Sequence, residues 1–214
     1  MVPVYVRYMG AEAYGFVAFF TLLQAWFQLL DLGLSPTLAR ETARFRGGAT
    51  DAQSLRRILR LMEGVFLLIA FLGTATIISC SKFIASQWLR VEQLPMPEVQ
   101  HAIILIAGVV FFRLVCGLYR GSITGFEHIV WLSVVNTVVA TARFVLVIPV
   151  LKLFGPSLRV FFNYQMILAV LEVIVLAAKS YSLLPKVSTT SGMLAWDWHA
   201  LKGRMRFSLG LAFA

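Results

Sequence analysis

The sequence predicts an all-α fold, a polytopic bundle of membrane-spanning helices, and three observations lead to this prediction. The chain has 214 residues, of which 59% are hydrophobic and 14% are charged, whereas soluble domains carry about 25% charged residues. The hydrophobic residues fall in runs of about 20, the length that crosses a bilayer core. Lysine and arginine cluster between these runs, as they do in the loops of membrane proteins.

The hydrophobic runs define five complete spans and the start of a sixth. The complete spans are expected at residues 16–38, 61–81, 100–119, 129–151 and 160–178, and the sixth begins near residue 207. Pro149 lies inside the fourth span, where it is expected to kink or end the helix. Residues 1–184 are therefore expected to form one transmembrane bundle. Residues 185–206 are expected to be an amphipathic cytoplasmic linker, and residues 207–214 the beginning of the next helix.

The loops differ in their content of lysine and arginine, and this difference predicts the orientation. The loops at 39–60, 120–128 and 179–206 together hold twelve of these residues, against five on the opposite face. The positive-inside rule places the first face in the cytoplasm. The N-terminus then lies outside, although nothing in the first fifteen residues could carry it there. We therefore expect the sequence to be a fragment that lacks a preceding helix.

Three charged residues, Arg113, Arg143 and Glu172, fall inside the spans, where each costs about 2.5–3.5 kcal/mol on insertion. Arg113 and Glu172 lie at a similar depth, so they either form a structural ion pair or line a cavity. Arg143 has no carboxylate at its level among the spans, which favours a cavity that receives a phosphate or pyrophosphate group. Asn136 and Gln165 either line the same cavity or bridge helices, and bridging is the commoner use.

Asp31, Gly33 and Glu63 are candidates for structural or gating roles near the cytoplasmic helix ends, where snorkelling or capping is the commoner role of the two acids. Gly33 permits either close helix contact or a local bend, and Asp31 is placed to accept hydrogen bonds from backbone donors that such a bend would free. The sequence contains no phosphate-binding glycine loop and no metal-ligand spacing. Neither enzymatic activity, a cofactor nor a metal ion is therefore expected.

Four short motifs carry a resemblance to a known family. Residues 8–16 (YMGAEAYGF) and 30–40 (LDLGLSPTLAR) resemble the start of bacterial polysaccharide biosynthesis proteins of the O-antigen flippase type. These belong to the multidrug, oligosaccharidyl-lipid and polysaccharide exporter superfamily, whose fold is called MATE-like. Residues 119–127 (YRGSITGFE) resemble the turn between the fourth and fifth helices of the family, and residues 207–210 (FSLG) resemble the start of its seventh helix.

The resemblance covers essentially the whole chain and implies most of the N-terminal lobe of a MATE-like flippase, with its first helix missing. It implies alternating access and flipping of a lipid-linked oligosaccharide of the undecaprenyl-pyrophosphate type in the bacterial inner membrane. Membrane lipids and other polysaccharide assembly proteins are the implied partners, and nucleic acid is not expected. Two alternatives remain: a MATE-like multidrug or cation antiporter, which needs acidic residues in its cavity, and a scaffold or inactive truncated remnant.

Overall fold

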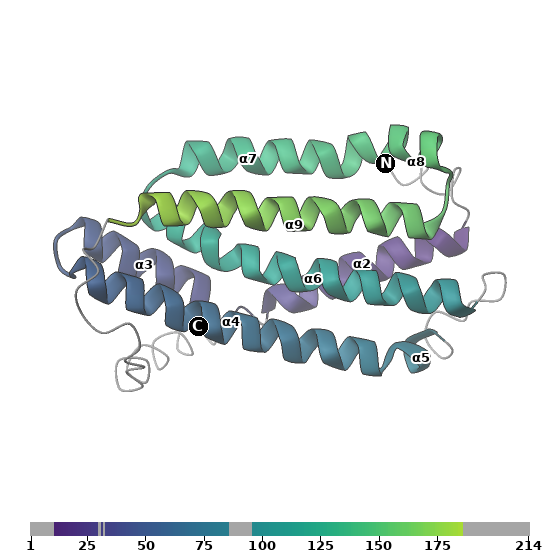
Figure 1. Ribbon diagram of the computed structural model, residues 1–214, viewed down its shortest axis with the longest axis horizontal. Helices are drawn as coiled ribbons and strands as arrows, with labels where there is room; N and C mark the ends of the chain where they lie inside the picture. Colours follow the sequence, from purple (N-terminus) through teal and green to yellow (C-terminus); the bar gives the residue numbers. More distant parts are fainter. Residues whose placement is uncertain (1–10, 30, 32, 86–95, 186–214) are drawn as a thin grey trace.

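The computed structural model describes residues 11–29, 31, 33–85 and 96–185, and these residues form helices joined by short turns, with no strand among them. The all-α prediction is therefore confirmed. Figure 1 shows an elongated bundle whose long helices run roughly along its length. The elements are α2 (Ala11–Leu29), α3 (Leu34–Arg46), α4 (Ala52–Ser79), α5 (Ser81–Phe83), α6 (Met96–Gly125), α7 (Ile129–Thr141), the π-helical turn η2 (Ala142–Leu146), α8 (Val147–Phe154) and α9 (Leu158–Leu183). The predicted linker at 185–206 and the predicted helix at 207–214 lie outside the described residues, apart from Pro185.

Four helical segments are long and apolar enough to cross a membrane among the described residues: Ala52–Ser79, Pro97–Gly125, Ile129–Phe154 and Leu158–Leu183. The last of these matches the predicted fifth span with longer ends. The prediction of a continuous span at 16–38 is wrong, because the chain breaks there into α2 and α3. Only the segment Gly15–Phe27 forms an apolar helix in this region, and it is shorter than the four spans.

The break between α2 and α3 follows from local backbone chemistry. Gly33 adopts a left-handed conformation with φ 73°, which glycine reaches without steric cost. The Asp31 carboxylate accepts hydrogen bonds from the backbone N–H of Ser35, at 3.1 Å, and from its hydroxyl, at 2.9 Å. As the sequence predicted, the carboxylate thereby satisfies a donor at the start of a new helix, where the backbone lacks helical partners.

Helix α6 is central, because it packs against α2, α3, α4, α7 and α9. Its contact with α3 uses Gly121 and Gly125, where an added Cβ would collide with the backbone of Ser35 and of Ala39. Small residues spaced by four let two membrane helices approach closely. The motif resemblance placed residues 119–127 in a turn between two helices, but α6 continues to Gly125 and the chain turns only afterwards, where Glu127 has φ 61°.

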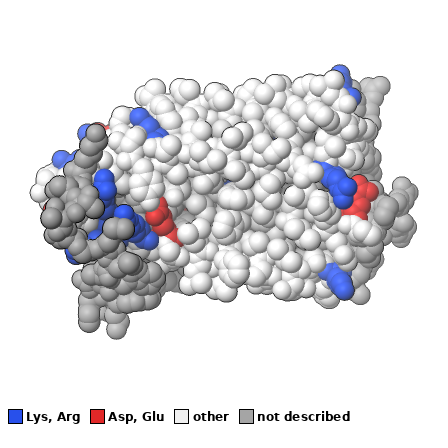
Figure 2. Space-filling view, in the orientation of Figure 1, with Lys and Arg blue, Asp and Glu red and all other residues white. Residues whose placement is uncertain are grey.

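The positive charges gather at one end of the bundle, here called the basic end, which carries the α3–α4 turn, the α6–α7 turn and the C-terminus of α9 (Figure 1). Figure 2 shows charged side chains at the two ends and an uncharged band between them. This arrangement agrees with the predicted grouping of the loops. The elements at the basic end, namely α3, the start of α4 and the end of α9, carry Arg40, Arg44, Arg46, Arg56, Arg57, Arg60 and Lys179. The elements at the opposite end, namely α5, α8 and the start of α9, carry Lys82, Lys152 and Arg159.

Polar contacts tie the helices together at the basic end. Tyr119 on α6 and Tyr181 on α9 both donate hydrogen bonds to the Glu63 carboxylate on α4, at 3.0 Å and 2.7 Å. One helix turn away, the hydroxyls of Ser180 and Ser122 lie 2.9 Å apart and form a buried hydrogen bond. Glu63 therefore joins three helices.

The band between the charged ends exposes large apolar side chains. Val130 on α7 and Leu153 on α8 are 80% and 81% exposed, and many other Leu, Ile, Val and Phe side chains are also exposed. A soluble monomer rarely leaves such a surface in water. Together with the four apolar helices, this surface indicates a membrane protein whose outer band contacts lipid.

The close α3–α6 contact leads to a test. Replacing Gly121 with Ala should push α3 away from α6, because the new methyl group meets the Ser35 backbone rather than a movable side chain. We expect the free energy of unfolding to fall by about 1–3 kcal/mol, measured by thermal unfolding in detergent. Gly64→Ala is the matched control, since nothing lies within 4 Å of its added Cβ. Equal stability of the two variants would show that the α3–α6 contact does not depend on glycine.

Candidate functional site

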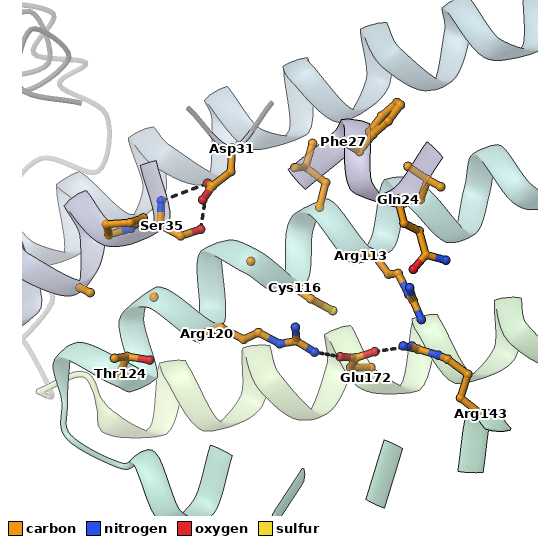
Figure 3. A pocket seen from close by; sticks show the side chains of 16 residues that line it. Gln24, Phe27, Asp31, Ser35, Arg113, Cys116, Arg120, Thr124, Arg143 and Glu172 are labelled. Atoms are coloured by element: carbon orange, nitrogen blue, oxygen red, sulfur yellow. Dashed lines mark hydrogen bonds and ion pairs between the residues drawn. The ribbon is translucent and has the colours of Figure 1, made fainter. Parts of the chain in front are cut away.

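A cavity of about 820 Å³ lies between α2, the α2–α3 break, α3, α6, η2 and α9. Its wall carries three positively charged side chains and two acidic ones, namely Arg113, Arg120, Arg143, Glu172 and Asp31. Figure 3 shows these side chains with their neighbours, and Glu172 lies between Arg120 and Arg143. The other lining residues are Gln24, Phe27, Ser35, Pro36, Ala39, Val110, Leu114, Cys116, Gly117, Gly121 and Thr124.

Glu172 on α9 uses both carboxylate oxygens in ion pairs with arginines from two other elements. Its Oε1 pairs with Nη2 of Arg120 on α6, and its Oε2 lies 2.9 Å from Nη2 of Arg143 on η2. The Glu172 side chain is 1% exposed, so its carboxylate lies in a low-dielectric interior, whereas the Arg120 side chain is 40% exposed. Of the two alternatives for Arg113 and Glu172, the ion pair is therefore wrong, whereas both residues do line a cavity. The expectation that Arg143 has no carboxylate at its level is also wrong.

The direction of the arginine side chains explains why Glu172 pairs with Arg120 on α6, although Arg113 lies at a similar depth by residue count. Helical side chains lean toward the N-terminus of their own helix, and α6 begins at the end of the bundle opposite the basic end. Arg120, although nearer the basic end, thus extends back along α6 to reach Glu172 (Figure 3). Arg113 lies twelve residues before Gly125, about 18 Å along the helix. Its side chain leans still farther from the basic end.

The π-helical turn η2 positions Arg143. A π-turn displaces backbone carbonyl groups from their usual helical donors, and such turns occur often at functional sites. Two side chains on α9 donate hydrogen bonds to these carbonyls. The Tyr164 hydroxyl donates to the Ala142 oxygen at 2.8 Å, and the Gln165 amide donates to the Arg143 oxygen at 3.3 Å. Pro149, just beyond the turn, cannot donate an N–H to Val145. The helix nevertheless continues to Phe154, so Pro149 does not end it.

Arg113 differs from the other two arginines because it pairs with no carboxylate among the described residues. Its guanidinium carbon lies 5.5 Å from the centre of the Phe20 ring, a distance at which cation–π attraction is favourable. Its buried Nε has no hydrogen-bond partner in the described part of the chain, and the same holds for Nε of Arg120 and of Arg143. Buried donors normally find an acceptor, so this group of arginines is short of hydrogen-bond acceptors among the described residues.

The remaining sequence candidates lie in different environments. Gln165 is 2% exposed and does not line the cavity, so it bridges α9 and η2. Asn136 is exposed on α7 and is likewise absent from the cavity wall. Glu63 ties helices at the basic end, whereas Gly33 forms the break that brings Asp31 to the cavity. Among the described residues, no three His, Cys, Asp or Glu side chains gather in a group that could hold a metal ion.

Arg120 was not predicted as a site residue, because the sequence analysis placed it in the loop at 120–128. The hydropathic run ends before the helix does, because the last turns of α6 contain Arg120, Ser122 and Thr124. A signal was nevertheless present in the spacing. Arg113 and Arg120 are seven residues apart, which places both on one helix face. Helical continuation through residues 119–125 would therefore have predicted two arginines on the cavity wall.

The bridge from Gln165 to the π-turn leads to a second test. Gln165→Leu should leave the Arg143 carbonyl without its donor and lower the free energy of unfolding by about 0.5–1.5 kcal/mol. Thermal unfolding in detergent measures this loss. The matched control is Asn163→Leu, on an exposed position of the same helix, which should change stability little. Similar losses in both variants would contradict a specific role for the bridge.

Comparison with known proteins gives no match to a family model, a curated protein or a solved structure.

Proposed function

We propose that this bundle forms part of a membrane carrier that flips a lipid-linked oligosaccharide by alternating access, and that its cavity receives the anionic pyrophosphate group. The proposal combines the motif resemblance with the charge of the cavity. The observation that carries it is Arg113, a cavity cation whose charge is balanced by no carboxylate among the described residues. Arginine is well suited to this role because its planar fork matches phosphate oxygens.

The cavity also has a suitable size and location. A volume of about 820 Å³ falls within the range of pockets that bury most of a small ligand. Arg113 lies about 18 Å along α6 from its end, near the middle of a hydrocarbon core about 30 Å thick. An anion held there is near the midplane, where transporters commonly bind their cargo. The lipid tail of such a substrate would remain in the bilayer.

A MATE-like cation antiporter is the second candidate, because Asp31 and Glu172 both line the cavity. A bound cation would need one of these carboxylates. Both oxygens of Glu172 already face arginines, and Asp31 accepts hydrogen bonds from Ser35. Three arginines against two acids leave the wall with net positive charge. This balance favours an anionic substrate over a cationic one.

Replacing Arg113 tests the anion site. Arg113→Ala should weaken binding of inorganic pyrophosphate to the purified protein about 10- to 100-fold, because a charged hydrogen-bond donor contributes about 1.5–3 kcal/mol. Arg113→Lys should retain part of the affinity, since it keeps the charge and loses the fork. Binding is measured as the ligand-dependent shift of the unfolding temperature in detergent. Arg159→Ala, outside the cavity, is the control and should bind as the wild type does.

Transport is tested separately in vesicles. The chain, reconstituted alone or with the partners it requires, should move a fluorescent lipid-linked oligosaccharide between leaflets, and Arg113→Ala should reduce the rate at least as strongly as it reduces binding. An organic cation serves as the alternative cargo. If the protein transports the cation and Arg113→Ala does not change the transport rate, the flippase proposal is contradicted and the antiporter is favoured.

A further inference from the structure

We infer that Glu172 is a built-in counter-ion of the anion site, which an incoming anion must displace from Arg120 and Arg143. The inference rests on the proposed function, because it assumes that the cavity accepts an anion. It adds a determinant of affinity and selectivity that the resemblance does not supply. The carboxylate occupies the same guanidinium groups that an anionic ligand would use.

The first step is the geometry of the two ion pairs. Arg120 and Arg143 each offer one Nη2 atom to a different oxygen of Glu172. All three residues belong to the cavity wall, and Figure 3 shows the carboxylate held between the two guanidinium groups. The Arg120 side chain is 40% exposed and that of Arg143 is 11% exposed, whereas Glu172 is 1% exposed. The cations therefore reach the cavity more openly than the acid that neutralises them.

Second, the backbone around Arg143 is fixed by hydrogen bonds, which limits the movement to side chains. The backbone at Arg143 is held by Gln165, and the adjacent carbonyl of Ala142 is held by Tyr164. The exchange of partners must therefore take place in the side chains of the arginines and of Glu172. Both arginines retain a buried Nε without a hydrogen-bond partner among the described residues. A ligand with several oxygens can bridge the two guanidinium groups, and rotation of an arginine side chain would bring its buried Nε to such a ligand.

The third step is the charge that the ligand meets. With three arginines and two acids, the cavity wall carries one net positive charge, and neutralising Glu172 raises this to two. A ligand with one negative oxygen replaces one carboxylate by another and gains little. Pyrophosphate carries more charge and bridges both guanidinium groups. Glu172 thus sets a threshold that selects for multiply charged anions, because specificity is a difference between competing interactions.

The decisive experiment compares pyrophosphate and acetate binding in the wild type, Glu172→Gln and Glu127→Gln. Glu172→Gln should bind pyrophosphate about tenfold more tightly than the wild type. The ratio of its affinity for pyrophosphate to its affinity for acetate should be smaller than in the wild type. This variant should also unfold at a lower temperature without an anion, and pyrophosphate should restore its stability more than it raises that of the wild type. Glu127→Gln removes the same charge and breaks a 2.5 Å ion pair with Arg46 outside the cavity, and it should bind pyrophosphate as the wild type does.

Different failures have different meanings in this experiment. If the wild type binds pyrophosphate and Glu172→Gln binds it equally well or more weakly, the counter-ion role is overturned. The anion site itself is not contradicted by that result. No pyrophosphate binding by any variant overturns both the counter-ion role and the proposed function. Should Glu172→Gln fail to fold, Glu172→Asp decides, because its shorter side chain keeps the charge but cannot span both arginines. It should bind pyrophosphate more tightly than the wild type, and unchanged affinity overturns the inference.

Discussion

The ion pairs of Glu172 with Arg120 and Arg143 are the interaction on which the rest of the site depends. They join α9, α6 and η2 around a carboxylate whose side chain is 1% exposed. A charge in such surroundings is stable only when it is paired and hydrogen-bonded. Removal of one partner from a buried pair costs about 3–5 kcal/mol, so the three charges must be kept or lost together. The relative positions of the three helices are thereby fixed where they enclose the cavity.

The cavity itself exists because different parts of α6 pack differently. Toward the basic end, Gly121 and Gly125 let α3 approach the backbone of α6. Farther along, the chain changes direction at the Gly33 break between α2 and α3, and the side chains of Arg113 and Arg120 line the cavity beside these helices. Close packing at one end and a change of chain direction at the other leave a hollow between them.

Sequence patterns predicted the features that depend on one segment at a time. Long apolar runs predicted the membrane helices, and the Asp31–Gly33 pattern predicted a bend with a carboxylate at its donors, because both follow from local chemistry. The choice of partner for Glu172 was not predictable, since depth gives one coordinate and leaves the rotation of each helix undefined. Arg120 was assigned to a loop because hydropathy falls before the helix ends. The π-turn at Arg143 depends on donors from α9, which no local pattern reveals.

The charge balance connects this architecture to a substrate. If the arginines served only to hold helices together, the stable arrangement would match each cation with a carboxylate, because an unmatched charge weakens a buried network. Glu172 instead serves two arginines, and Arg113 rests against the Phe20 ring without a carboxylate in the described part of the chain. The network is thus short of negative charge and of hydrogen-bond acceptors among the described residues. A multiply charged anion would supply both, which is why we propose an anionic headgroup rather than a cationic drug as the ligand of this cavity.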